Sequence, residues 1–228
     1  MRNLNNFTMR PFTEKTAFLL FFLTAFSWMT KADAQAFEYP EYSDSSIKIK
    51  VAFSGSRPTI VDFANAYLDY AQKEHEFFGQ VNKEWKKHLQ KKPLSKNCSI
   101  LTDVKNGYMC YQKDHVNESD TIIMEMCFWN CADGKQKLVA ANTIWKMDGD
   151  YGWDEYIGTR FFVYNNKKKE MRPVFSDDIG ALYDGDGLSV FFLPRKGKNI
   201  QVSAAGSGER WNEVLEWDGF KFSSKEIE

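Results

Sequence analysis

The sequence has 228 residues, with 30 Lys and Arg against 31 Asp and Glu, so its formal charge is −1. Apolar residues make up 43% and aromatic residues 16%, far above the range of disordered chains. This composition excludes a polybasic nucleic-acid-binding protein and a collagen-like chain, and no fixed repeat period is present.

The first 36 residues have the pattern of an export signal. Basic residues at the start are followed by an uncharged run of 15 residues that is closed by Lys31. This run is short for a transmembrane helix, which needs about 20 apolar residues, and it suits the hydrophobic region of a signal peptide. Small residues precede Gln35 and Phe37, where we expect cleavage. The predicted product is secreted or periplasmic and soluble after cleavage, with no stable membrane insertion; a short N-terminal anchor helix is the alternative.

Residues 37–46 are polar and aromatic without a period, and we expect a mobile lead-in there. From Ile47 onward apolar residues alternate with Lys48 and Lys50. This alternation predicts a half-buried strand over 47–53.

A long amphipathic helix is predicted to follow this strand. Thr59 with Asp62 three residues later resembles a capping box at its start. The apolar residues recur at steps of three, four or seven, which keeps them on one stripe that we expect to pack against a sheet. Gly79 is expected to kink the helix or to split it in two. The stripe consists of Ile60, Phe63, Tyr67, Ala71, Phe78, Val81, Trp85 and Leu89.

Past Ser99 the apolar period changes to two, and Asn-Gly and Asp-Gly pairs recur as hairpin signals. Two strand-like runs, 161–164 and 190–193, are apolar on both faces, which predicts a sheet that is covered on both sides. The fold class is therefore α+β, with an N-terminal strand and a long helix packed on an antiparallel meander of about eight to nine strands. We expect a single domain over 47–228, whose curled sheet is barrel-like or two-layered.

All four cysteines, Cys98, Cys110, Cys127 and Cys131, fall within 34 residues. In an exported chain an even, clustered count favours disulfides, and the spacing does not match a zinc site. Antiparallel pairing across the loop at 114–119 places Cys110 nearly opposite Cys127, whereas Cys127–Cys131 across a tight turn is the local alternative. We expect at least one bridge in this region and leave its pairing open.

No complete catalytic or cofactor motif is present in the sequence. His75-Glu76 lacks the second histidine of a zincin, and there is no phosphate loop or dinucleotide fingerprint. The acidic stretches that begin at Asp148 and Asp184 both lack an oxygen ligand at the fifth position of a calcium loop. We therefore predict no catalytic residue, no metal and no cofactor, and the mild charge predicts no nucleic-acid partner.

Aromatic and acidic residues are concentrated between positions 145 and 156. Flat rings stack on the CH face of a sugar and carboxylates accept hydrogen bonds from its hydroxyls, while Trp and Tyr are also enriched at protein interfaces. The alternative is that the rings anchor a hairpin to the core and the acids keep its edge soluble. The candidate ligand-binding residues are Trp145, Asp148, Asp150, Tyr151, Trp153, Asp154, Glu155 and Tyr156.

These observations favour an exported, non-enzymatic binding or interaction module whose ligand is a glycan or a protein surface. A small secreted hydrolase that uses a carboxylate pair is one alternative, and it requires two carboxyls about 5–9.5 Å apart in a cleft. A structural envelope or inhibitor-like protein is the other. The acids available for the pair are Asp148, Asp150, Asp154, Glu155, Asp177, Asp178, Asp184 and Asp186.

Overall fold

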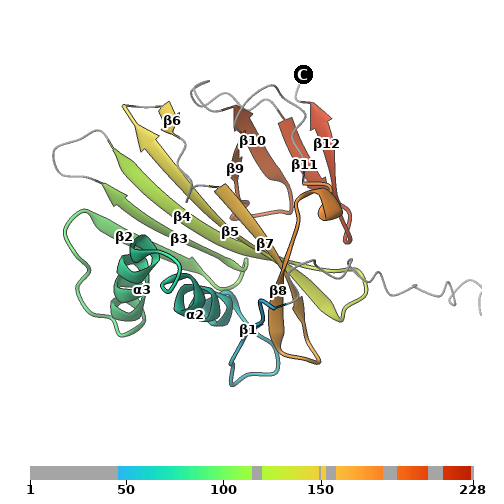
Figure 1. Cartoon of the computed structure of the whole chain (residues 1–228), viewed down its shortest axis with the longest axis horizontal. Helices are drawn as coiled ribbons and strands as arrows, with labels where there is room; N and C mark the ends of the chain where they lie inside the picture. The colour runs from blue at the N-terminus through green and yellow to red at the C-terminus, as the bar shows by residue number, and fades with distance from the viewer. Residues whose placement is uncertain are drawn as a thin grey trace, which may run out of the picture. The chain divides into compact units, whose positions relative to one another are not determined.

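The computed structural model describes residues 46–114, 120–148, 150–152, 158–181, 189–204 and 213–226. The predicted signal peptide and nearly all of the predicted lead-in lie outside this part. The described residues form an α+β structure with two antiparallel sheets and two α-helices (Figure 1). None of the helices described is long and apolar enough to cross a bilayer.

Two helices, α2 (Ile60–Ala71) and α3 (Glu76–Leu89), occupy the stretch for which one helix was predicted. The predicted N-terminal cap is present, because Oδ2 of Asp62 accepts hydrogen bonds from the N–H and the hydroxyl of Thr59 at 2.7 and 2.8 Å. The apolar stripe is buried except for Leu89, which is 41% exposed. The two helices therefore present one apolar face to the sheet.

The helices separate at 72–75 and not at Gly79, where we had expected the kink. His75 has an extended backbone with φ of −152°, and its Nδ1 accepts a hydrogen bond from the N–H of Phe77 at 3.1 Å. This side chain therefore caps the start of α3. The break falls between Ala71 and Phe78, the one place where successive residues of the apolar stripe are seven positions apart. A continuous helix would have one full turn there with no stripe residue to pack on the sheet.

Eight strands form a sheet that curls into a half-barrel (Figure 1), in the order β1-β8-β7-β5-β4-β3-β2 with β6 paired to β5. Most neighbours are consecutive hairpins, whereas β1 pairs with β8 from much later in the chain. The strands are β1 (Ile49–Lys50), β2 (Cys98–Asp103), β3 (Tyr108–Asp114), β4 (Thr121–Asn130), β5 (Gln136–Met147), β6 (Asp150–Gly152), β7 (Gly158–Asn165) and β8 (Glu170–Val174).

A second sheet of four strands follows, in the order β12-β11-β10-β9. A short 3₁₀ helix, η1 (Asp177–Ile179), comes between the two sheets in the chain. The described residues thus contain twelve strands in two sheets. The sequence predicts an N-terminal strand and about eight to nine meander strands, so the predicted number of strands is too low. The strands of the second sheet are β9 (Ser189–Phe192), β10 (Ile200–Ala204), β11 (Glu213–Trp217) and β12 (Phe222–Glu226).

The half-barrel sheet is covered on both faces. On β7, Phe162 and Tyr164 pack with the helices, whereas Phe161 and Val163 pack with residues of the second sheet. The two core clusters are therefore separated by the strands of the first sheet. This arrangement confirms the prediction that the run at 161–164 is buried from both sides.

Candidate functional site

The segment predicted to bind a ligand includes the β5–β6 hairpin. Asp148 stands at its turn, with a φ of 49°, and is exposed, as is Asp150. Trp145 is half-buried. Four of the predicted residues lie outside the described part of the chain: Trp153, Asp154, Glu155 and Tyr156.

The hairpin register divides the described residues between two faces. Trp145 and Asp150 are diagonal neighbours on the helix side of the sheet. Tyr151 points to the other side, where it is 7% exposed and its ring lies edge-on to Phe192 with centroids 5.1 Å apart. Tyr151 is therefore a core residue and does not share a surface with Trp145.

A row of apolar side chains continues past the helices on the face that holds Trp145. Ile122 pairs with Trp145 across β4 and β5, and both are half-buried. Met147, the next residue along this face, is 43% exposed. None of the three belongs to a core cluster of the described residues. We call Ile122, Trp145 and Met147 the outer row.

The indole of Trp145 has an unused hydrogen-bonding group. Its Nε1 atom is buried and finds no acceptor among the residues that the structure describes. A buried donor without a partner costs about 1–3 kcal/mol, so an acceptor for this group would be stabilising. Asp150 is the diagonal neighbour of Trp145 on the same face.

A second polar site, which the sequence reasoning missed, lies between the two sheets. Glu125, in the middle of β4, is 8% exposed. Its carboxylate accepts hydrogen bonds from the hydroxyl of Tyr108 at 2.5 Å and from the N–H of Leu193, just after β9, at 3.1 Å. These bonds connect two strands of the half-barrel with the second sheet.

Asn142 makes a second polar connection between the sheets. Its side-chain oxygen accepts a hydrogen bond from the hydroxyl of Thr159 at 3.0 Å, and its amide donates to the carbonyl of Phe191 at 2.5 Å. The sequence does carry a signal for this site, because Glu125 interrupts the otherwise apolar run of β4 between two methionines. An acid at such a position must be paired or hydrogen-bonded.

The titratable groups between the sheets have raised pKa values. Among the described residues no lysine or arginine forms an ion pair with Glu125. Burial raises the pKa of Glu125. Burial, and then the nearby Glu125, raise the pKa of Tyr108 and bring the pKa of Cys110 to about 11. A thiol with such a pKa is a poor nucleophile at neutral pH, so this cluster fastens the sheets together and does not present a reactive group.

The four cysteines are free thiols, so the expected disulfide does not form. Cys110 pairs with Glu125, two residues before Cys127 on β4, and the two cysteines are therefore diagonal neighbours. Diagonal neighbours are about 7–8 Å apart, beyond the usual Cα separation of a disulfide. Cys131 is four residues past Cys127 along extended chain, about 13 Å away at the rise of a strand.

The described histidines have structural contacts. His75 caps α3, and Nε2 of His88 lies 3.1 Å from the hydroxyl oxygen of Thr102 while its ring stacks on Trp85. His115 lies outside the described residues. Within the described part of the chain no three His, Cys, Asp or Glu side chains are grouped so that they could hold a metal ion.

The structure places four of the acids that a hydrolase would need. Asp148 and Asp150 are exposed on the β5–β6 hairpin, and Asp177 and Asp178 lie on η1. None of these four is buried. The acids of this set outside the described residues are Asp154, Glu155, Asp184 and Asp186.

The sequence matches no protein-family model and no curated protein, and the fold matches no solved structure.

Proposed function

We propose that this protein is an exported, non-enzymatic binding module, and that the outer row together with Asp150 forms its ligand-binding face. The observation that carries this proposal is the position of Trp145. Its ring is half-buried on a sheet face outside the core, with a carboxylate as diagonal neighbour and an indole N–H that lacks an acceptor among the described residues. Export is inferred from the sequence of the first 36 residues alone.

A glycan is the ligand that this chemistry suits best. The indole face packs against the CH groups of a sugar ring, and Asp150 accepts a hydrogen bond from one of its hydroxyls. Met147 adds exposed apolar surface beside the indole. The acids of the turn disfavour an anionic sugar, so the proposal is restricted to neutral glycans.

A glycan array followed by titration tests this proposal. We expect a neutral glycan to bind the wild-type protein, and Trp145→Ala to weaken that binding by more than about 1 kcal/mol. Asp150→Asn should weaken it as well. Leu101→Ala is the matched control, because Leu101 is a 40% exposed apolar residue on edge strand β2.

Two results would contradict the proposal. The first is an array without a hit. The second is a loss of several kcal/mol in the free energy of unfolding of Trp145→Ala, because the ring would then be part of the core. NMR of the indole N–H, assigned with Trp145→Phe, reports directly whether a bound glycan reaches this group.

A further inference from the structure

The chain as a whole is almost neutral, yet one end of the half-barrel is strongly basic. The residues lie on β1 and just before it, in the loop before α2, in the β4–β5 turn and at the start of β5, and in the β7–β8 turn and on β8. We call this region the cationic end. It consists of Lys48, Lys50, Arg57, Lys135, Lys137, Lys167, Lys168, Lys169 and Arg172.

Backbone hydrogen bonds hold these segments together. The N–H of Asn166 donates to the carbonyl of Lys135 at 3.2 Å, which joins the two turns. The N–H of Val51 donates to the carbonyl of Lys169 at 3.0 Å, which joins β1 to the second of them. Basic residues that are far apart in the sequence therefore occupy one end of the sheet.

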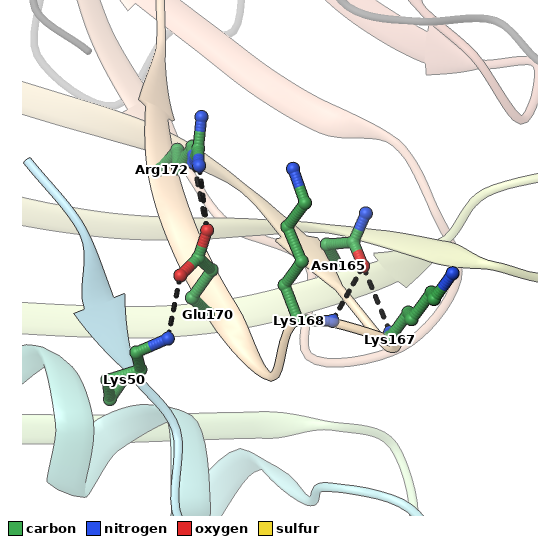
Figure 2. A network of polar contacts seen from close by, with 6 residues as sticks. All are labelled: Lys50, Asn165, Lys167, Lys168, Glu170 and Arg172. Atoms are coloured by element: carbon green, nitrogen blue, oxygen red, sulfur yellow. Dashed lines mark hydrogen bonds and ion pairs between the residues drawn. The ribbon is translucent and has the colours of Figure 1, made fainter.

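Figure 2 shows how the main carboxylate of this region is used. Glu170 lies between Lys50 and Arg172, with ion-pair distances of 2.9 Å to each. Lys167 and Lys168 extend from the β7–β8 turn, and only their backbone N–H groups are held, by the side-chain oxygen of Asn165 at 2.9 Å. Glu170 thus pairs with two cations. The exposed turn lysines Lys167 and Lys168 form no ion pair with a carboxylate among the described residues.

Two further acids of this end take part in a local turn and a helix cap. Asp133 accepts hydrogen bonds from the backbone of its own turn, and Asp62 caps α2. Lys137 is 7% exposed, and its amine donates to the side chain of Asn130 and lies 4.7 Å from the centre of the Phe128 ring. Among the described residues neither Lys137 nor the exposed Arg57 has an ion-pair partner.

We propose that the cationic end docks the protein on the anionic headgroups of a phospholipid bilayer. Six of the nine residues are exposed lysines, which act as point charges and suit a diffuse negative surface better than the bidentate recognition of one group. Each lysine near an anionic membrane contributes about 1 kcal/mol. A single-stranded nucleic acid would need exposed rings for stacking, and the described rings that contact these lysines, Phe53 and Phe128, are half-buried against Lys169 and Lys137.

Vesicle flotation tests this proposal with the full secreted chain. The probes are vesicles of phosphatidylcholine alone and vesicles that also contain phosphatidylglycerol. We expect binding only to the second kind, weakening as salt is added. The triple variant Lys135→Glu, Lys167→Glu, Lys168→Glu should bind roughly a hundredfold more weakly, because three favourable contacts are lost.

The matched control carries the same change of charge elsewhere. Lys83, Lys92 and Lys96 are exposed, on α3 and in the loop that follows it, and their replacement by Glu should leave vesicle binding nearly unchanged. Circular dichroism of both variants checks that they fold. Equal loss in the control, no binding of the wild type to the anionic vesicles, or preferred binding to duplex DNA would each overturn the proposal. Glycan binding through Trp145 is measured separately, so the two proposals fail independently.

Discussion

The hydroxyl of Tyr108 donates a 2.5 Å hydrogen bond to Glu125 inside the interface between the two sheets. Glu125 also receives the N–H of Leu193, so one buried acid joins β3, β4 and the chain after β9. Apolar packing alone has no direction and would allow the sheets to slide. The polar bonds add direction and fix how the second sheet sits on the first.

Replacing Glu125 with Ala should therefore be strongly destabilising. It leaves the Tyr108 hydroxyl and the Leu193 N–H buried without an acceptor, and we expect the free energy of unfolding to fall by about 3 kcal/mol. Glu125→Gln keeps an acceptor oxygen and should lose less. Urea denaturation of the two variants checks this, and an equal loss in both would show that the charge and not the hydrogen bonding matters.

The buried acid should also make stability depend on pH. Burial raises the pKa of Glu125 above the ordinary value of 4.5, so the folded protein holds this proton more tightly than the unfolded chain does. The stabilisation from this group is thus complete below about pH 4.5 and is lost as the pH rises through the raised pKa. Denaturation curves measured from pH 4.5 upward should show this decline in the wild type, and Glu125→Gln should remove it.

The absence of disulfides predicts a thiol count. Unfolding the protein without a reductant and titrating with a thiol reagent should give four thiols per chain. In the folded protein Cys110 should react slowly, because burial and the nearby Glu125 bring its pKa to about 11. A count of two after unfolding would show that a bridge forms in solution.

Gly180, just after η1, should not tolerate a side chain. Its φ is +65°, and a Cβ atom there would lie 2.3 Å from the carbonyl oxygen of Phe222. We expect Gly180→Ala to lower the free energy of unfolding by at least about 2 kcal/mol. Gly134 has the same φ of +65° but open space around it, so Gly134→Ala should cost only the backbone strain. Thermal unfolding of both variants separates strain from the clash.

The α+β class and the positions of several strands follow from local patterns. The period of two along β4 correctly predicts that Met124 and Met126 share one face, and both belong to the core under the helices. The capping pair at Thr59 is likewise readable from sequence, because cap and partner are three residues apart. Patterns of this kind involve neighbours in the chain, where the geometry is fixed by the helix or strand itself.

Other features depend on distances that the sequence does not contain. Cys110 was predicted to lie nearly opposite Cys127, but it pairs with Glu125, two residues away in register. The register depends on the length of the β3–β4 connection, which the sequence does not fix. The sequence leaves open whether the meander is barrel-like or two-layered, because hairpin signals do not tell where a chain passes from one layer to another. The site between the sheets was missed since Asn142 and Phe191 meet only after that packing.

The pairing of β1 with β8 has a consequence for aggregation. Lys50 and Glu170 are 120 residues apart, and β1 is only two residues long. Without this short strand, β8 would end the sheet with unpaired backbone groups that another molecule could extend. The two-residue strand β1 and the charge of Lys50 thus protect this edge of the sheet against pairing with another molecule, and so against polymerisation.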